Sequence, residues 1–263
     1  MTIGNCARCN TKQTELKKSH ILSKFGYKAL RSSSRDNPNP VAINGTVAFQ
    51  TSKQIKESLL CHQCEQYFAN GCENYIAKLT YNQDGVCRLY KLLGYNAKEA
   101  DVHHPPEPVA VESGCLNTEY FLQFAISIFW RTTISKDNCA RSYTFSEKYN
   151  EIFRAYLNNE ISFPDQTCVH LSVVDQPKDI QKNSFSRILT IPVRVKYKGY
   201  HQHGFLFNGL YFRMYVGEMI PKDKKTACLG HSPRKCLLFA GAKHLPVYET
   251  IVKISKEARN TIR

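Results

Sequence analysis

Cys6-Ala7-Arg8-Cys9 is the first of two Cys-x-x-Cys pairs in this chain, and Cys61-His62-Gln63-Cys64 is the second. Each pair places two thiolates on one tight turn, and together the pairs offer a zinc ion the four ligands of a tetrahedral site. The spacing therefore predicts a zinc site that holds the N-terminal segment together. The alternative is that the pairs arise by chance among 11 cysteines and are ordinary small buried side chains.

The interval between the pairs is long, since residues 10–60 give 51 intervening positions. A short zinc ribbon has fewer, so the sequence predicts an insertion inside the zinc module. Residues 23–30 are expected to form a short helix, and Asn44-Gly45 predicts a tight hairpin turn between two short strands within residues 41–49. After the second pair, apolar residues at helical intervals predict a helix over residues 65–79.

Length and composition predict a folded chain with more than one structural unit. The chain has 263 residues, of which 42% are hydrophobic and 22% charged, a balance typical of folded proteins. We expect an α+β fold, with a small zinc-stapled ββα module in residues 1–100 and a linker in residues 101–113 that contains a proline-rich segment. A larger α+β domain with an antiparallel sheet is expected in residues 114–263.

The second unit divides into a helical part and a β-rich part. Asn117-Thr118-Glu119 is a favourable helix start for an apolar helix over residues 120–130, and residues 146–158 predict a second helix. Segments rich in β-branched and aromatic residues then predict strands within residues 169–174, 187–197, 204–216 and 236–239.

The charge of the chain favours an anionic partner. Lys and Arg number 36 against 22 Asp and Glu, a formal net charge of +14. A field of this sign attracts polyanions, so nucleic acid is the expected partner, with an acidic protein or an anionic membrane surface as alternatives. No apolar run approaches the roughly 20 residues of a membrane span, and the N-terminus has no secretory signal. We therefore expect a cytoplasmic protein that does not span a membrane.

Two further stretches carry a family resemblance: Leu16-Lys17-Lys18-Ser19-His20-Ile21-Leu22-Ser23-Lys24 and Leu59-Leu60-Cys61-His62-Gln63-Cys64-Glu65. Together with the first cysteine pair, they resemble the zinc-braced HNH, or His-Me finger, endonucleases of bacteria and phages. The resemblance covers about the first 80 residues. It implies a ββα-metal fold and metal-dependent hydrolysis of phosphodiester bonds in DNA, in phage defence or in mobile-element processing.

The resemblance also implies roles for individual residues. His20 matches the general base that removes a proton from water, and Glu65 lies where the helix offers a ligand to Mg²⁺ or another divalent ion. The four cysteines match the ligands of a structural zinc. The lysines near His20 are the expected nucleic-acid contacts, namely Lys18, Lys24 and Lys28. A homo-oligomer, and activation by a small molecule or a protein, are compatible with this hypothesis.

Three positions depart from the family pattern. Ser19 stands where many members have an acidic or histidine metal ligand, and Ser23 stands where a proline is common. The position at which the family usually has an asparagine falls near Lys56. These departures support an alternative hypothesis, a catalytically inactive zinc-binding module that binds nucleic acid or a partner protein. In that case His20 hydrogen-bonds a turn, and Glu65 is a first-turn carboxylate that the helix dipole favours.

Two other groups in the second half suggest metal ligands. His201-Gln202-His203 is expected in a hairpin turn, where two histidines can hold a metal from one side of a strand. Cys228, His231 and Cys236 also lie near one another in the sequence but contain no Cys-x-x-Cys pair. Surface or core positions are the alternative interpretation of both groups.

Overall fold

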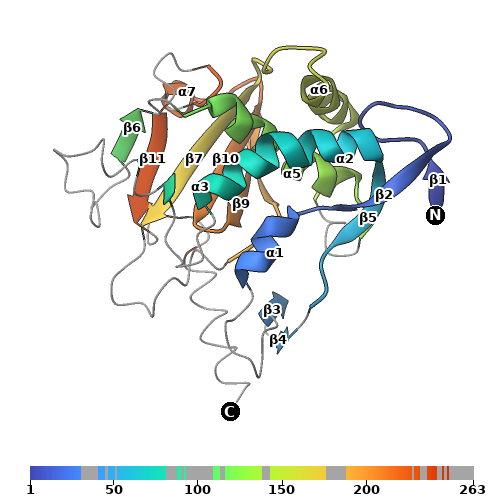
Figure 1. Ribbon diagram of the computed structural model, residues 1–263. Coiled ribbons are helices and arrows are strands. Elements are labelled where there is room, and N and C mark those ends of the chain that lie inside the picture. The colour runs from blue at the N-terminus through green and yellow to red at the C-terminus, as the bar shows by residue number, and fades with distance from the viewer. Residues whose placement is uncertain are drawn as a thin grey trace.

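Two sheets with helices between them organise the chain in the computed structural model, which confirms the α+β class (Figure 1). The structure describes residues 1–30, 41–44, 47–50, 52–80, 88–89, 92, 109–112, 116–137, 143–175, 188–226, 228–231, 236–241, 245 and 248. A three-stranded antiparallel sheet lies near the N-terminus, and a six-stranded sheet contains the later strands.

The N-terminal sheet has the order β1-β2-β5. Its strands are β1 (Thr2–Gly4), β2 (Thr14–His20) and β5 (Lys56–Cys61), and helix α2 (His62–Phe68) follows β5 with no intervening loop. The pairing of β2 with β5 shifts register between Lys17 and Lys18, which marks a β-bulge next to the strand end that carries His20. Strands β2 and β5 with helix α2 form the expected ββα arrangement.

The helix predicted over residues 65–79 is present but interrupted. After α2, the chain forms a π-helical turn, η1 (Ala69–Glu73), and then α3 (Asn74–Thr80). Gly71, with φ −89° and ψ −112°, departs from helical geometry inside this turn. The segment from α2 to α3 therefore bends at Gly71 and is not one continuous helix.

Two local predictions in the insertion are confirmed. Helix α1 (Lys24–Leu30) occupies the expected position after the His20 strand. Strands β3 (Val41–Asn44) and β4 (Val47–Gln50) pair with each other as an antiparallel two-stranded ribbon.

The larger sheet has the order β6-β11-β7-β10-β9-β8. Its neighbours pair antiparallel, except that β11 runs parallel to β7. The strands are β6 (Val109–Glu112), β7 (Thr167–Asp175), β8 (Val193–Tyr197), β9 (Tyr200–Phe207), β10 (Leu210–Gly217) and β11 (Cys236–Gly241), and a short helix α7 (Lys222–Thr226) follows β10. The predicted antiparallel sheet is present with this one parallel pair.

A two-residue turn divides the β-rich segment predicted over residues 204–216 into two strands. Asn208 and Gly209 have φ values of 48° and 80°, the left-handed conformation that the tightest hairpins require at both turn positions. Strands β9 and β10 therefore form a hairpin in the middle of the sheet.

The two predicted helices of the second half are present and are capped by side chains. They are α5 (Thr118–Ile134) and α6 (Glu147–Leu157). The Asn117 side chain accepts a hydrogen bond from the backbone N–H of Glu119 at 3.1 Å, and Ser146 caps α6 in a similar way. Such caps satisfy N–H groups that have no partner within the helix.

Helix α5 joins the two halves of the structure. It packs against η1 and α3 on one side and against β7 of the large sheet on the other, as Figure 1 shows. Its side chains from Phe121 to Thr132 are all buried. The largest hydrophobic cluster accordingly combines residues from the N-terminal helices, α5 and the large sheet.

Helix α1 docks on the large sheet through a glycine. A Cβ atom on Gly26 would lie 2.6 Å from Cζ of Phe207, far inside a normal contact. Phe25 also packs edge-on against Phe207, with ring centroids 5.0 Å apart. The absence of a side chain at Gly26 therefore allows α1 to lie directly on β9.

The expected division into residues 1–100, 101–113 and 114–263 stays a prediction. Strand β6 lies within the expected linker and pairs with β11, whereas residues 93–108 and 113–115 lie outside the described part of the chain. Within the described residues, no helix combines the length and the apolar composition needed to cross a membrane.

Candidate metal centre and the His20 cluster

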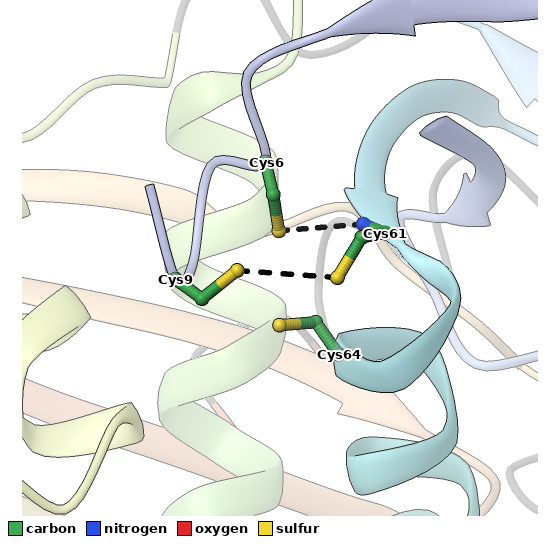
Figure 2. Close-up of side chains that lie close together, drawn as sticks. All are labelled: Cys6, Cys9, Cys61 and Cys64. Atoms are coloured by element: carbon green, nitrogen blue, oxygen red, sulfur yellow. Dashed lines mark hydrogen bonds between the residues drawn. The ribbon is translucent and has the colours of Figure 1, made fainter. Parts of the chain in front are cut away.

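The four cysteines of the two pairs converge on one point. Their sulfur atoms all lie within 4.8 Å of one another, and Figure 2 shows all four directed at a common centre. The Sγ atoms of Cys9 and Cys61 are 3.9 Å apart. Tetrahedral zinc with Zn–S bonds of about 2.3 Å separates its sulfurs by roughly 3.8 Å, so this geometry fits a metal ion.

Local backbone geometry positions the cysteines. The first pair lies on a loop in which the Asn10 N–H donates to the Cys6 carbonyl at 2.9 Å and Asn10 has a left-handed φ of 56°. The second pair lies at the junction of β5 and α2. The Cys61 backbone N–H donates to the Cys6 sulfur at 3.3 Å, so the two pairs are linked by a hydrogen bond as well as by proximity.

Hydrogen bonds polarise the thiols of this cluster. The Cys64 thiol donates a hydrogen bond to Cys6, and this bond, with bonds from backbone N–H groups, lowers the pKa of Cys6 to about 4. The same bond raises the pKa of Cys64, and burial raises it further. Cysteine binds metals as the thiolate, so the cluster already favours the anionic form at one ligand.

Arg8 adds a cation beside the sulfurs. Its Nη1 donates to Cys64 Sγ at 3.6 Å, while Nε and Nη2 donate to the Leu157 carbonyl at 3.0 and 2.7 Å. The guanidinium also stacks 3.8 Å above the Tyr67 ring. Four thiolates carry more negative charge than one Zn²⁺ neutralises, so Arg8 balances the centre electrostatically and ties its loop to the end of α6.

The donor set suits a structural zinc. Four sulfur ligands from two Cys-x-x-Cys pairs fill a tetrahedral shell and leave no open position for substrate, which is the pattern of structural sites. Cys72 lies outside the cluster, and burial raises its pKa to about 12. Cys72 is therefore a buried packing residue of the hydrophobic core.

His20 lies at the end of β2 with one ring nitrogen fixed. Its Nε2 is 2.7 Å from Oε1 of Gln54, and an amide oxygen only accepts, so Nε2 carries the proton and Nδ1 carries a lone pair. Burial lowers the pKa of His20, which keeps the ring neutral near pH 7. Gln54 was not identified from the sequence, because no spacing rule relates it to His20.

Glu65 lies in the first turn of α2, partly buried, and its Oε1 is enclosed with no hydrogen-bond partner. Burial raises the pKa of Glu65, and a hydrogen bond from Ser19 opposes that shift. Ser19 is completely buried. An enclosed carboxylate oxygen without a donor is a feature that a bound cation would satisfy.

Arg131 of α5 connects this region to the second half of the chain. Its Nη1 donates to the backbone carbonyl of His20 at 2.9 Å, and its Nη2 donates to Oε1 of Glu73 at 2.8 Å. The Arg131 side chain is 2% exposed and that of Glu73 16%. Glu73 therefore belongs to a largely buried ion pair and not to a solvent-exposed helix face.

Within the described part of the chain, neither His20 nor Glu65 belongs to a group of side chains that could share a metal. Among the described residues, the four cysteines are the one group of three or more His, Cys, Asp and Glu side chains that could share a metal. The three lysines expected to contact nucleic acid are exposed on β2 and α1, namely Lys18, Lys24 and Lys28. Lys18 lies on β2, the strand that ends at His20, and Lys24 and Lys28 lie on α1, which follows that strand.

The other candidate histidines of the second half, His203 and His231, form hydrogen bonds within the fold. His201 and His203 lie within β9 and not in a hairpin turn, which corrects the expectation from sequence, because the turn between β8 and β9 falls just before them at Lys198 and Gly199. His203 Nδ1 contacts the Tyr143 hydroxyl at 2.9 Å, and burial lowers its pKa to about 3. His231 contacts two backbone carbonyls.

No protein-family model matches this chain, and comparison with curated proteins and with solved structures gave no significant match either. The four-cysteine cluster is therefore the chemical feature that this chain itself supports, and it indicates a metal-binding protein.

Proposed function

We propose that the chain is a metal-dependent, HNH-like endonuclease that hydrolyses phosphodiester bonds in DNA. The observation that carries the proposal is the hydrogen bond between His20, at the end of β2, and Gln54, just before β5, because it leaves a neutral imidazole with its lone pair on Nδ1. A base of this kind can remove a proton from water.

The neighbouring residues supply complementary roles. Glu65, whose enclosed Oε1 has no donor, would hold a divalent cation such as Mg²⁺. When bound, that cation would stabilise the charge on the scissile phosphate and on the leaving oxygen. The structural zinc would hold β5 and α2 at the angle that places Glu65 near β2.

The charge of the molecule supports a nucleic-acid substrate. The net charge of +14 favours DNA through counterion release. The exposed lysines Lys18, Lys24 and Lys28 lie on the strand that ends at His20 and on the helix that follows it. Cleavage of foreign DNA in phage defence, in the cytoplasm, is the biological role that fits this chemistry. Control by an activator or by self-association belongs to the same proposal.

A second candidate function rests on two specific observations. Ser19, next to the proposed base, is completely buried and offers a hydroxyl where a cation prefers a carboxylate, and Glu73 is already paired with Arg131. Because neither Ser19 nor Glu73 is available as a second carboxylate ligand, the site fits a zinc module that binds nucleic acid or a protein without cleaving it.

Plasmid nicking separates the two functions. The zinc-loaded protein is incubated with supercoiled plasmid in Mg²⁺, Mn²⁺ or Ni²⁺, beside the variants His20→Ala, Gln54→Leu and Glu65→Gln. We expect the parent to nick the plasmid, His20→Ala to be slower by about 10²-fold or more, and Gln54→Leu to be slower because the ring is no longer oriented.

His62→Ala is the matched control, because His62 is exposed in the same module. It should nick like the parent. Salt-dependent DNA binding by a folded parent that nicks with none of the three metals would contradict the endonuclease proposal and support the binding module.

A further inference from the structure

Strand β8 is the last strand in the order of the six-stranded sheet, and all five of its residues are exposed. It pairs with β9 on one side, and within the described part of the chain no strand pairs with its other side. An edge of this kind presents backbone N–H and C=O groups to which another extended chain can bind. The outer edge of β8 is therefore a candidate surface for a partner strand.

The register of the sheet identifies the backbone groups that point outward. The last residue of β8, Tyr197, pairs with Tyr200 across a two-residue turn. In an antiparallel pair, residues that exchange hydrogen bonds with the neighbouring strand alternate with residues that do not, and the pair that closes a two-residue turn is hydrogen-bonded. Every second residue counted back from Tyr197 therefore bonds to β9. The N–H and C=O groups of the two residues between them, Arg194 and Lys196, point away from the sheet.

The side chains of β8 form an apolar row on one face and a cationic row on the other, because successive residues of a strand point to opposite faces. The apolar row consists of Val193, Val195 and Tyr197, which are 52%, 46% and 43% exposed. Arg194 and Lys196 form the cationic row, and both act electrostatically on His201 of β9. A partner strand would therefore meet a different chemistry on each face.

Two further side chains enlarge the apolar surface at the turn. Met219 is 63% exposed, and its backbone N–H donates to the carbonyl of Gly199 at 3.2 Å. The rings of Tyr197 and Tyr200 stack with their centroids 4.9 Å apart. Of the eight large hydrophobic side chains that are exposed among the described residues, four lie on β8 or at its turn. Exposed apolar side chains that gather in this way mark an interaction surface.

The charges of β8 decide between two kinds of partner strand. Arg194, Lys196 and the turn residue Lys198 are exposed, and the Arg194 guanidinium donates to the neutral carbonyl of Thr144 at 2.9 Å. A second copy of β8 at this edge would bring the cations of both copies together, and like charges at neighbouring cross-strand positions are destabilising. A strand with carboxylates at these positions is attracted instead, so the complementary partner is acidic.

We propose that the outer edge of β8 binds an extended segment of a partner protein in which acidic residues alternate with apolar ones. The partner backbone would pair with the N–H and C=O groups of Arg194 and Lys196, and its carboxylates would lie beside their side chains. In such strand addition, main-chain hydrogen bonds give affinity and alternate side chains give specificity. The inference is independent of the endonuclease proposal, because it uses neither His20 nor the four cysteines.

Binding of a synthetic peptide to the full chain tests the inference. The probe is a short fluorescent peptide of alternating glutamate and valine, and a peptide of alternating lysine and valine is the reference. Fluorescence anisotropy should show saturable binding of the glutamate peptide, with the lysine peptide at least about tenfold weaker. Equal binding of the two peptides, or no saturable binding of the glutamate peptide, would overturn the inference.

Two substitutions at one position separate backbone pairing from charge. Lys196→Gln removes the charge and keeps the outward N–H, whereas Lys196→Pro removes both, and an edge strand tolerates proline at such a position. The glutamate peptide should bind Lys196→Pro about tenfold more weakly than Lys196→Gln. Equal affinities would mean that no backbone pairing occurs. Lys222→Gln is the matched control, because it removes an exposed lysine from α7, and it should bind the peptide like the parent.

A modified peptide makes the same comparison if Lys196→Pro does not fold. N-methylation of every residue removes the backbone donors of the glutamate peptide and keeps its charges, so the parent should bind it about tenfold more weakly. Unchanged affinity would contradict strand addition.

Other occupants of the edge give different results. A dimer of the parent that Lys196→Pro dissociates, as measured by sedimentation, would identify a second copy and overturn the inference. A single-stranded oligonucleotide should not displace the glutamate peptide. If it does, and Lys196→Gln and Lys196→Pro weaken oligonucleotide binding equally, the cationic row binds nucleic acid and the inference is wrong.

Discussion

Arg131 donates a hydrogen bond to the backbone carbonyl oxygen of His20 at 2.9 Å, across 111 positions of the sequence. The same guanidinium pairs with Glu73 in the π-helical turn at 2.8 Å. Helix α5 of the second half thus holds the end of β2 and the turn after α2 in one arrangement. The position of the proposed base depends on a residue far outside the module that contains it.

Arg131→Met should destabilise the protein strongly. It leaves the Glu73 carboxylate buried without a cation, and breaking a buried pair in this way costs about 3–5 kcal/mol. Chemical denaturation of the variant and the parent measures the change in the free energy of unfolding. The double variant Arg131→Met with Glu73→Gln should recover part of the loss, because the unpaired charge is gone. Additive losses would contradict the coupling.

Removal of the metal should unfold the N-terminal module. The protein should bind about one zinc per chain at the four cysteines, and the binding energy of such sites, on the order of 10 kcal/mol, is folding energy. Cys6→Ser should lose the metal and the helical signal of α2, as followed by metal analysis and circular dichroism. Cobalt in place of zinc should give the strong thiolate charge-transfer bands of a four-sulfur site.

Cys72→Ala is the control for the zinc experiment, since Cys72 is buried but lies outside the cluster. It should keep full zinc content. Loss of metal in Cys72→Ala, or full content in Cys6→Ser, would show that the ligands are assigned wrongly.

Gly26→Ala should weaken the contact between α1 and the large sheet. The new Cβ would lie 2.6 Å from the Phe207 ring, and overpacking of this kind costs about 1–3 kcal/mol. Thermal unfolding should show a lower midpoint than the parent. Phe207→Leu makes room for the new methyl group. The double variant should therefore lose less stability than the sum of the losses in Gly26→Ala and in Phe207→Leu. Strict additivity would argue against this contact.

Buried histidines should make the fold sensitive to acid. Burial lowers the pKa of His170 to about 4 and that of His203 to about 3, whereas histidine in an unfolded chain titrates near 6.5. Between these values the unfolded chain binds protons that the folded chain does not, so stability is lost as pH falls below about 6.5. Each histidine contributes a slope of up to about 1.4 kcal/mol per pH unit.

The variant His203→Phe isolates one of these contributions. Its free energy of unfolding should fall less steeply with acid than that of the parent between about pH 6 and pH 4, whatever its absolute stability. An unchanged slope would mean that His203 is protonated in the folded protein and that its burial is less complete than the structure indicates.

Some parts of the candidate site could be predicted because their signals are short. The Cys-x-x-Cys spacing predicted the four sulfurs that converge in the structure, and Asn44-Gly45 predicted the pairing of β3 with β4. Other parts carry no such signal. The π-helical turn around Gly71 interrupts a continuous apolar pattern, and Arg8 lies between two ligands with nothing in its spacing to mark a contact with α6.

The sequence by itself determined several local elements: the cysteine pairs, the helix starts at Asn117 and Ser146, and the strands that form the β3–β4 ribbon. Each of these elements depends on residues a few positions apart, and local backbone preferences determine their geometry. Only the tertiary structure decided that Gln54 orients His20 and that Arg131 pairs with Glu73. The physical reason is that packing of α5 and the strand order bring distant residues together, and no sequence period encodes those contacts.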